Sequence, residues 1–415
     1  MRKFTAVLNN FNNIMGNNNE TFSSKRSGKA NVSNLENKLE INFMKICFVA
    51  PGSNVHTKRW VNFFAEKGHD VHLITFEPVE DGYSKSVKIY NLIRILPNLW
   101  LILRYINGII WSFQAWWLIR SIEPDIINAH YITLNGYLCV FNRFHPLVLT
   151  AWGSDIWIDP KKNFLLKILT KYTLKKADCI TCDGDNIKEE IARLGDSHNK
   201  IKIICFGTDI KKFYPNKKNK ELKRALEINN SPIVISLRNL KPIYDVGSLI
   251  KAIPLILKEV PEAKFIVAGR GSQEAELKQL AKSLGVSDSI RFAGFISNDE
   301  LPQYIALADV YVSTSLSDGG IAASTAEAMA CGLPVVITDF GDNRKWVEDG
   351  LNGFIVPLKD PEALAEKIIY LLKNEDIRKE FGERNRKIIE ERNNYYKEME
   401  KMENIYTELI ERYKT

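Results

Sequence analysis

The chain has 415 residues, which is too long for one ordinary domain and fits two. Hydrophobic residues make up 45% of it, which excludes a disordered or fibrous protein. The formal net charge of +7 favours an anionic ligand or membrane surface, but the lysines are spread along the chain, so no nucleic-acid partner is expected.

Residues 1–42 are rich in asparagine and poor in apolar side chains. This composition predicts a disordered extension, or residues that lie upstream of the true start. Met44 is then the natural first residue, because the first core strand begins beside it. No convincing signal peptide is present, and the six scattered cysteines indicate a reducing compartment, so we expect a cytoplasmic protein.

From Met44 onward, short apolar runs alternate with amphipathic segments. Strands are predicted at 45–50, 70–75, 125–130, 146–150, 178–182, 200–205, 233–237, 264–268, 310–313, 334–338 and 354–356. Helices are predicted at 57–67, 99–121, 163–176, 186–194, 246–259, 273–284, 322–330 and 361–373, with two more between 376 and 415. Continuous apolar strands separated by helices predict an α/β protein whose parallel sheets are covered on both faces.

A polar, lysine-rich stretch at 209–230 divides this pattern into two doubly wound domains. We place the domains at 44–213 and 214–390, and we expect the last helix, 391–415, to pack back on the N-terminal domain. Ligands of such sheets bind at the carboxyl ends of the strands, so the cleft between the domains is the expected site.

The segment 99–121 combines four tryptophans with many aliphatic residues, and Arg104, Asn107 and Gln114 interrupt it. Its uninterrupted apolar length is too short to span a bilayer. Two interpretations stay open. It is either a buried domain helix or an interfacial helix with aromatic rings at the headgroup level, which suits a lipid-linked acceptor.

The most informative segment, 310–338, has the pattern strand, glycine-containing loop, helix, turn, strand. The loop Asp318-Gly319-Gly320 lets the backbone approach a ligand closely, and the helix after it aims free N–H groups at the cleft. This arrangement favours a diphosphate, whereas a helix start capped by Ser or Asp is the alternative. Glu327 lies about two turns into the helix, where its carboxylate can accept hydrogen bonds from ribose hydroxyls.

This segment resembles the signature of the retaining glycosyltransferases of family 4, which have the GT-B fold. The family pattern is Glu, seven residues, Glu, followed by Ala-Met-Ala-x-Gly-x-Pro-Val-Val. Other matching stretches lie at 59–60, 66–71, 151–155, 206–209, 236–240 and 346–353, and the resemblance runs from Met44 to the end. It implies two Rossmann-like domains facing across a cleft, and a hexosyltransferase that uses a nucleotide sugar without cofactor or metal.

The resemblance also implies residue roles. Glu327 matches the glutamate that holds the ribose, and Arg238 matches the arginine that neutralises the diphosphate. His130 matches a histidine near the donor sugar, so the implied catalytic set is His130, Arg238 and Glu327. The implied donor-binding set is Gly52, Arg238, Asp318, Gly319, Gly320, Ile321, Ala322 and Glu327.

On the acceptor side, His56, Trp152 and Asp155 lie in matching loops that face the cleft. For a lone His or Asp in such a loop, capping or packing remains the alternative. The sequence departs from the family pattern at Gly319, where the first glutamate is expected and where Asp318 is the adjacent carboxylate. A family lysine is also replaced, by the stretch 243–245.

Two short patterns point towards metals but lack the context for them. Cys179 and Cys182 form a C-x-x-C within a strand-like run, with no second pair and no histidine nearby. Asp183-Gly184-Asp185 has the Asp-x-Asp form of metal-dependent glycosyltransferases of another fold. Here it joins a strand to a helix, and Asp185 is expected to cap that helix.

The expected activity is transfer of a hexose-type sugar, with retention, to a glycan or lipid-linked acceptor in cell-surface polysaccharide or glycoconjugate synthesis. The segment 99–121 is the expected point of peripheral membrane contact. The two departures keep open a degenerate sugar-nucleotide binder, and a GT-B sugar-nucleotide epimerase is a further alternative.

Overall fold

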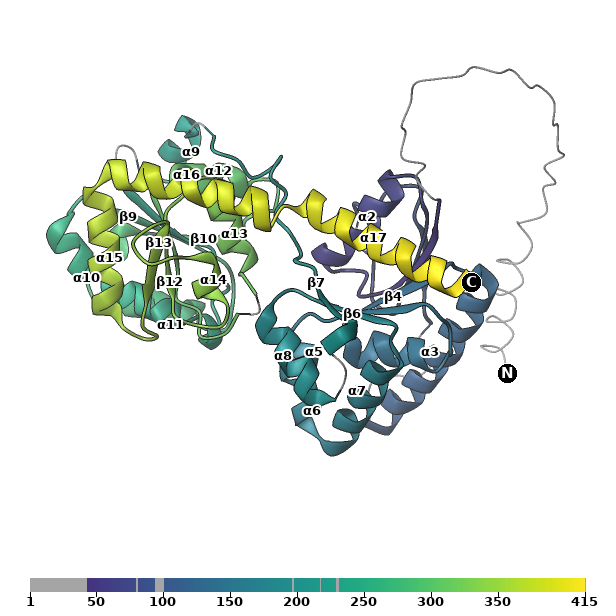
Figure 1. Ribbon diagram of the computed structural model, residues 1–415. Coiled ribbons are helices and arrows are strands. Elements are labelled where there is room, and N and C mark those ends of the chain that lie inside the picture. Colours follow the sequence, from purple (N-terminus) through teal and green to yellow (C-terminus); the bar gives the residue numbers. More distant parts are fainter. Residues whose placement is uncertain are drawn as a thin grey trace, which may run out of the picture. The chain divides into compact units, whose positions relative to one another are not determined.

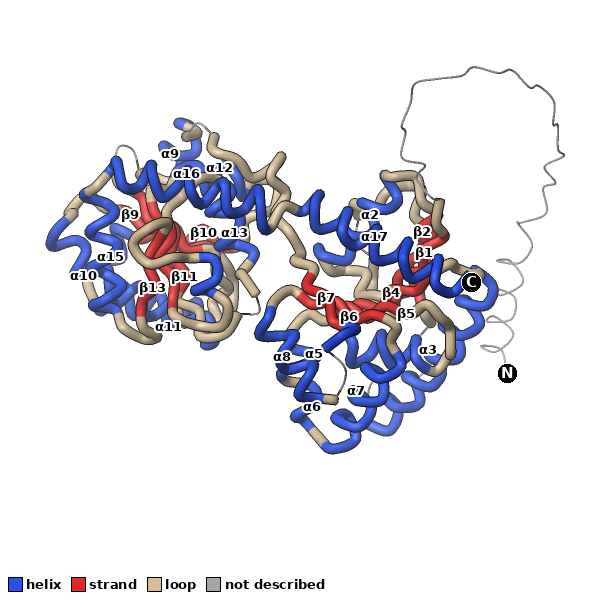
Figure 2. The backbone as a smooth tube through the Cα atoms, viewed as in Figure 1, coloured by secondary structure: helices blue, strands red, loops and turns tan. Residues whose placement is uncertain are grey.

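The computed structural model describes residues 43–79, 81–93, 101–195, 198–216, 218–228, 231–318 and 320–414, without the side chains of 101–106 and 198. The expected extension at 1–42, the first residues of the segment 99–121 and Gly319 therefore lie outside the described residues. The described part holds two separate sheets, whose strands are drawn red in Figure 2, and Figure 1 labels most of the helices around them.

The first sheet has seven parallel strands in the order β3-β2-β1-β4-β5-β6-β7. They are β1 Lys45–Val49, β2 Asp70–Thr75, β3 Lys88–Asn91, β4 Ile126–His130, β5 Leu147–Thr150, β6 Cys179–Cys182 and β7 Ile201–Ile203. Strands β1, β4 and β5 are apolar almost throughout and buried along their length, as parallel strands covered on both faces must be.

Alternate residues of β1 point to opposite faces of this sheet and enter different clusters. Ile46 and Phe48 pack with α2 (Val55–Glu66), whereas Cys47 and Val49 pack with α3 (Leu101–Ile122) and α8 (Asp185–Leu194). The remaining helices of this domain are η1 Ile132–Gly136, α4 Tyr137–Val140, α5 Ser154–Trp157, α6 Asp159–Lys162, α7 Phe164–Lys176 and η2 His198–Lys200.

The second sheet has six parallel strands in the order β10-β9-β8-β11-β12-β13. They are β8 Ile233–Ser236, β9 Lys264–Ala268, β10 Ile290–Gly294, β11 Val310–Ser313, β12 Val335–Thr338 and β13 Gly353–Val356. The helices are α9 Lys220–Ala225, η3 Pro242–Tyr244, α10 Val246–Glu259, α11 Glu274–Ser283, η4 Ser287–Ser289, α12 Leu301–Leu307, α13 Ala323–Ala330, α14 Asn343–Trp346, α15 Pro361–Lys373 and α16 Glu375–Arg392. Together the two sheets give the expected α/β architecture.

The last helix, α17 (Tyr395–Lys414), packs against the first sheet and not the second. Met399, Met402 and Tyr406 on its buried stripe join the cluster of Ile46 and Phe48. The chain thus returns to the first domain at the end of α16. There, the backbone N–H of Thr208 donates to the carbonyl oxygen of Asn393 over 2.7 Å.

The apolar runs of the sequence revealed two of the four edge strands, β7 and β13, but not β3 and β10. Both are half-exposed, and their residues include Lys, Asn, Arg and Gly, because only one side of an edge strand is paired. The expected cap of α8 was also wrong. Gly184 occupies the N-cap position, and Asp185 lies in the first turn, where it forms an ion pair of 2.7 Å with Lys345.

Candidate active site

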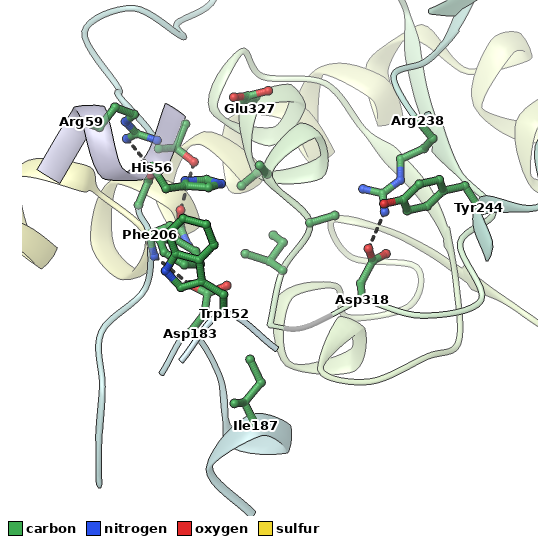
Figure 3. A pocket seen from close by; sticks show the side chains of 17 residues that line it. His56, Arg59, Trp152, Asp183, Ile187, Phe206, Arg238, Tyr244, Asp318 and Glu327 are labelled. Atoms are coloured by element: carbon green, nitrogen blue, oxygen red, sulfur yellow. Dashed lines mark hydrogen bonds and ion pairs between the residues drawn. The ribbon is translucent and has the colours of Figure 1, made fainter. Parts of the chain in front are cut away.

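The carboxyl ends of strands from both sheets surround a cavity of about 320 Å³. Figure 3 shows His56, Phe206 and Trp152 gathered on one wall and Arg238, Tyr244 and Asp318 on the other. The lining residues are His56, Arg59, Trp152, Asp183, Ile187, Phe206, Gly207, Thr208, Arg238, Tyr244, Asp318, Ile321, Ala322, Ala323, Ala326, Glu327 and Asn393.

Arg238 follows β8, and its guanidinium is almost completely buried. It is paired with the Asp318 carboxylate, donates to Ser315 Oγ over 3.4 Å and lies 4.5 Å from the centre of the Tyr244 ring. Burial alone would lower the pKa of Arg238, but the charge of Asp318 and the neighbouring tyrosines raises it above its ordinary value. The buried Nε has no hydrogen-bond partner among the described residues, so the Arg238 guanidinium keeps one N–H donor for a ligand.

Helix α13 begins at the cavity without a capping side chain. Its N-cap residue is Ala322, whose methyl group cannot accept a hydrogen bond from the first turn. The alternative of a helix start capped by Ser or Asp is therefore wrong, and the first N–H groups of α13 are available to an anion. Ile321, Ala322 and Ala323 place this helix start on the cavity wall.

Gly320 brings the loop before α13 against the first domain. Its φ is +60°, and a Cβ placed there would lie 2.7 Å from Oδ2 of Asp183 and 2.8 Å from its carbonyl oxygen. Only glycine fits this conformation and this approach without strain. The loop Asp318–Gly320 thus depends on contact with the strand end at Asp183.

Replacing Gly320 by alanine should destabilise the protein by about 1–3 kcal/mol, through strain at positive φ and the clash with Asp183. The measurement is urea unfolding. Gly285→Ala is the matched control, because Gly285 has φ +69° but no atom within 4 Å of the added Cβ. Equal losses in the two variants would show that the approach to Asp183 contributes nothing.

Glu327 lies on α13 and lines the cavity beside Ala323 and Ala326. None of the described residues forms a hydrogen bond or ion pair with its half-buried carboxylate. Burial raises the pKa of Glu327 to about 7, against smaller opposing effects of Arg59 and Lys212. A carboxylate left in this state at a cavity wall is poised for hydrogen-bond donors from a ligand.

The opposite wall is aromatic. The His56 ring stacks on Phe206 with ring centres 4.3 Å apart, and Trp152 meets both rings edge to face. Burial, and then the charge of Arg59, lower the pKa of His56 to about 4, so its imidazole is neutral at pH 7. A flat aromatic wall with a neutral imidazole suits the apolar face and hydroxyl groups of a sugar.

His130 lies behind this wall and does not line the cavity. Its ring is fully buried between Trp60 and Trp152, and its Nε2 lies 3.0 Å from the amide oxygen of Asn128. Tyr406 of α17 donates to the same oxygen over 2.7 Å. Nε2 therefore carries the proton, and burial lowers the pKa of His130 to about 3.

Asp155 and Gly52 also support the walls without lining the cavity. The Asp155 carboxylate accepts from the backbone N–H groups of Ile132, Trp152 and Gly153 over 2.8–3.0 Å, as the capping alternative expects. Burial raises the pKa of Asp155 to about 6, although these hydrogen bonds oppose the effect. The Gly52 N–H donates to Thr75 Oγ1 over 3.0 Å, which fixes the loop after β1.

Sequence reasoning missed several lining residues. Arg59 donates to the carbonyl oxygen of Gly207 over 2.7 Å and stacks on Tyr395, and Asp183 accepts from the N–H of Phe206 over 2.7 Å. Phe206 and Asn393 come from the two segments that connect the domains. The Arg59-Trp60 and Phe206-Gly207 matches were signals for two of them, and Asp183 had been noted only as part of an Asp-x-Asp pattern. No group of three His, Cys, Asp or Glu side chains that suits a metal occurs within the described ranges.

Residues 45–184 match the family described as Glycosyl transferase 4-like, and residues 218–388 match Glycosyl transferases group 1. The chain therefore belongs to the group 1 glycosyl transferases of family 4, and it is a glycosyltransferase with the GT-B fold. The two matches cover strands of both sheets that surround the cavity.

The names of proteins similar to this chain describe different enzymes. N-acetyl-alpha-D-glucosaminyl L-malate synthase of Bacillus anthracis is 24% identical over 365 residues, 83% of this chain and 91% of that protein. GDP-mannose-dependent alpha-(1-6)-phosphatidylinositol monomannoside mannosyltransferase of Mycobacterium tuberculosis is 29% identical over 177 residues, 41% of this chain and 46% of that one. The structure of Anabaena HepE in complex with UDP has a TM-score of 0.71 at 19% identity, covering 88% of this chain and 100% of that chain.

Proposed function

We propose that this glycosyltransferase moves a hexose-type sugar, with retention, from a nucleoside-diphosphate sugar to a glycan or lipid-linked acceptor of cell-surface glycoconjugate synthesis. The observation that carries the proposal is that three groups of complementary chemistry share one cavity. They are the Arg238 guanidinium, the uncapped start of α13 and the unpartnered Glu327 carboxylate.

The donor's diphosphate binds between Arg238 and the start of α13. As the bond to the sugar breaks, negative charge grows on the departing diphosphate. These fixed positive groups therefore stabilise the transition state more strongly than the ground state. We infer that this charge comes from the protein itself, without a metal ion. Glu327 accepts hydrogen bonds from the ribose hydroxyls. These supply the hydrogen-bond donors that its carboxylate lacks in the free protein.

A second cavity of about 270 Å³ continues from this place within the second domain. Arg238, Tyr244, Ala323 and Glu327 line both cavities, and the second extends to Gly269 and Phe295. We assign the base to this second cavity and the sugar to the first. Both the mannosyltransferase relative and the HepE structure carry the name of a nucleotide or nucleotide sugar, which supports a nucleotide donor.

The acceptor then meets the sugar beside the aromatic wall of His56, Trp152 and Phe206. Its hydroxyl attacks the face from which the diphosphate departs and passes its proton to the departing phosphate oxygen. The bond from the sugar to the diphosphate is thus replaced by a bond to the acceptor, and the configuration is retained. His56 is neutral and hydrogen-bonds the acceptor, whereas buried His130 acts as a positioning residue that supports Trp152 from behind. Asp318, which is already paired with Arg238, takes the position nearest to the family's missing glutamate.

Thermal-shift measurements on the full chain with a panel of nucleoside-diphosphate sugars test this proposal. A donor at 100 times its Kd stabilises the native state by about 2.7 kcal/mol, which raises the melting temperature by several degrees. Free sugars, which lack the diphosphate, serve as the matched control. The absence of a shift with every nucleotide sugar would contradict the donor site, and a shift without any later turnover would favour the degenerate binder.

A further inference from the structure

Helix α7 has an unusual arrangement of its polar and apolar residues. It buries Thr170 and Thr173 completely, whereas Phe164 is 78% exposed and Leu165 62% exposed. A helix that packs on a domain normally turns its large apolar side chains inward. The exposed stripe of α7 therefore faces a partner that is absent from the folded domain.

Helix α3 carries a second exposed stripe near the first. Ile109 and Phe113, one helical turn apart, are 70% and 67% exposed. Phe113 stacks on Trp116, and Arg120 lies 5.0 Å from the centre of the Trp116 ring. Helix α4 contacts both α3 and α7, and Ile109 of α3 lines a groove together with Leu166 of α7. We call the exposed residues of these two helices the α3–α7 face.

The α3–α7 face is basic as well as apolar. Helix α7 contains four lysines, Lys167, Lys171, Lys175 and Lys176, and no acidic residue. All four are exposed, and α3 likewise contains arginines but no acidic residue. Exposed aromatic and aliphatic side chains surrounded by cations complement an anionic membrane surface. No helix in the described part of the chain is long and apolar enough to cross a membrane.

A groove of about 770 Å³ opens between α3, α4 and α7. Its lining is mostly apolar, and its volume falls in the range of ligand sites, roughly 300–1,000 Å³. Ser112 and Asn163 are among its polar residues, and the Asp159 carboxylate, which is paired with Lys162, accepts from Tyr131 over 3.1 Å and from Thr133 over 2.6 Å. The groove thus combines a mostly apolar lining with a polar cluster at Asp159, which we call its polar end.

Tyr131 connects this polar end with the active site. It lines the groove, and its ring meets the Trp152 ring edge to face, with centres 6.1 Å apart. Trp152 lines the catalytic cavity. Tyr131 also has φ +69°, a conformation that a non-glycine residue adopts only under constraint. A long molecule can therefore lie with its tail in the groove and its head beyond Tyr131.

We propose that the groove binds the hydrocarbon chain of a lipid-linked acceptor, which is presented while the α3–α7 face rests on an anionic membrane. This inference rests on the proposed function, because it names the acceptor class for the same catalytic cavity. The apolar stripes enter the bilayer surface, the lysines contact its anionic headgroups, and the polar end of the groove directs the acceptor's head towards Trp152.

Chain binding is tested with the fluorescent probe 11-(dansylamino)undecanoic acid and the full-length protein. Gly108 lines the groove, and a Cβ added there meets no atom within 4 Å, so Gly108→Leu should fill the groove without disturbing the fold. We expect the variant to bind the probe at least tenfold more weakly, with an unchanged melting temperature and an unchanged shift by the nucleotide sugar. Equal probe binding by the two proteins would overturn the proposal.

Membrane contact is tested by co-sedimentation with vesicles of dioleoylphosphatidylglycerol or of dioleoylphosphatidylcholine. We expect at least tenfold stronger binding to the anionic vesicles, and at least tenfold weaker binding to them by the double variant Phe113→Ser/Phe164→Ser. The double variant Leu351→Ser/Leu358→Ser removes exposed leucines of the second domain and should bind like the wild type.

Two results would overturn membrane contact. One is equal vesicle binding by the two double variants. The other is a concentration-dependent dimer in sedimentation equilibrium that Phe113→Ser/Phe164→Ser abolishes, since a second copy would then cover the face. In either case a persisting shift by the nucleotide sugar would leave the donor site intact, which keeps the two proposals separable.

Discussion

Arg238→Ala should weaken binding of the donor's nucleoside diphosphate about 10- to 100-fold, because hydrogen bonds to a charged group contribute roughly 1.5–3 kcal/mol each. The guanidinium is held at the cavity by Asp318, Ser315 and the Tyr244 ring, and its Nε is still free to donate. Titration calorimetry of the full chain with nucleoside diphosphates measures the loss.

The same substitution leaves the buried Asp318 carboxylate unpaired, so its effect on folding must be separated from its effect on binding. The double variant Arg238→Ala/Asp318→Asn removes both charges and should recover the melting temperature without recovering the affinity. Arg344→Ala, which removes an exposed arginine paired with Asp339, is the matched control and should bind normally. Restored affinity in the double variant would show that Arg238 only stabilises the fold.

Glu327→Gln should weaken binding of nucleoside diphosphates roughly tenfold or more, yet stabilise the free protein above pH 7. The glutamine side chain loses the charge-assisted hydrogen bonds to the ribose, which are about twice as strong as neutral ones. Adenosine or uridine diphosphate compared with inorganic diphosphate isolates this loss, because inorganic diphosphate has no ribose and should bind both proteins alike.

The stabilisation follows from the direction of the pKa shift. Burial raises the pKa of Glu327 to about 7 from its ordinary value of 4.5, so the folded state binds its proton more tightly than the unfolded state. Glu327 therefore costs no stability below pH 4.5. As the pH rises from 4.5 through 7, the cost grows to at most about 3 kcal/mol.

Urea unfolding of the wild type and of Glu327→Gln at pH 5 and pH 8 measures this difference. The variant should gain little at pH 5 and most of its advantage at pH 8. If the Glu327 carboxylate instead stabilised the fold, Glu327→Gln would be less stable than the wild type at pH 8. That result would contradict this prediction. A residue that lowers stability in the free protein and strengthens ligand binding is characteristic of a functional site.

The sequence predicted every central strand and the edge strands β7 and β13, but not the edge strands β3 and β10. Strands β1, β4, β5, β8, β11 and β12 are buried on both faces, so each is a run of apolar residues that the pattern reveals. Edge strands β3 and β10 contain polar residues, since one side meets solvent. Their pairing is decided by tertiary contacts that no local pattern reports.

The part of the cavity lining that belongs to the second domain was equally predictable, because it is built from one continuous stretch and the arginine after β8. Asp318, Ile321, Ala322 and Glu327 all line the cavity. The wall formed by the first domain combines segments that are distant in sequence. There, the position of a residue at a strand end did not predict whether its side chain lines the cavity. Asp155 follows β5 and His130 is the last residue of β4, yet their side chains turn into the protein, where backbone N–H groups bind Asp155 and Asn128 binds His130.

Residues such as Arg59 and Asp183 were missed for a related reason. Each lines the cavity through a contact with the segment 206–208, which connects the domains, and the partners are far apart in sequence. Patterns within one domain do not show which residues a connecting segment will contact.

The most direct test of the account is turnover of the donor that gives the largest thermal shift, followed by ³¹P and ¹H NMR with a membrane lipid extract as acceptor. We expect release of the nucleoside diphosphate, together with a product whose anomeric proton shows the donor's own configuration. Arg238→Ala/Asp318→Asn should abolish both signals. Tight donor binding without any release would contradict the central claim and leave a protein that holds nucleotide sugars without transferring them.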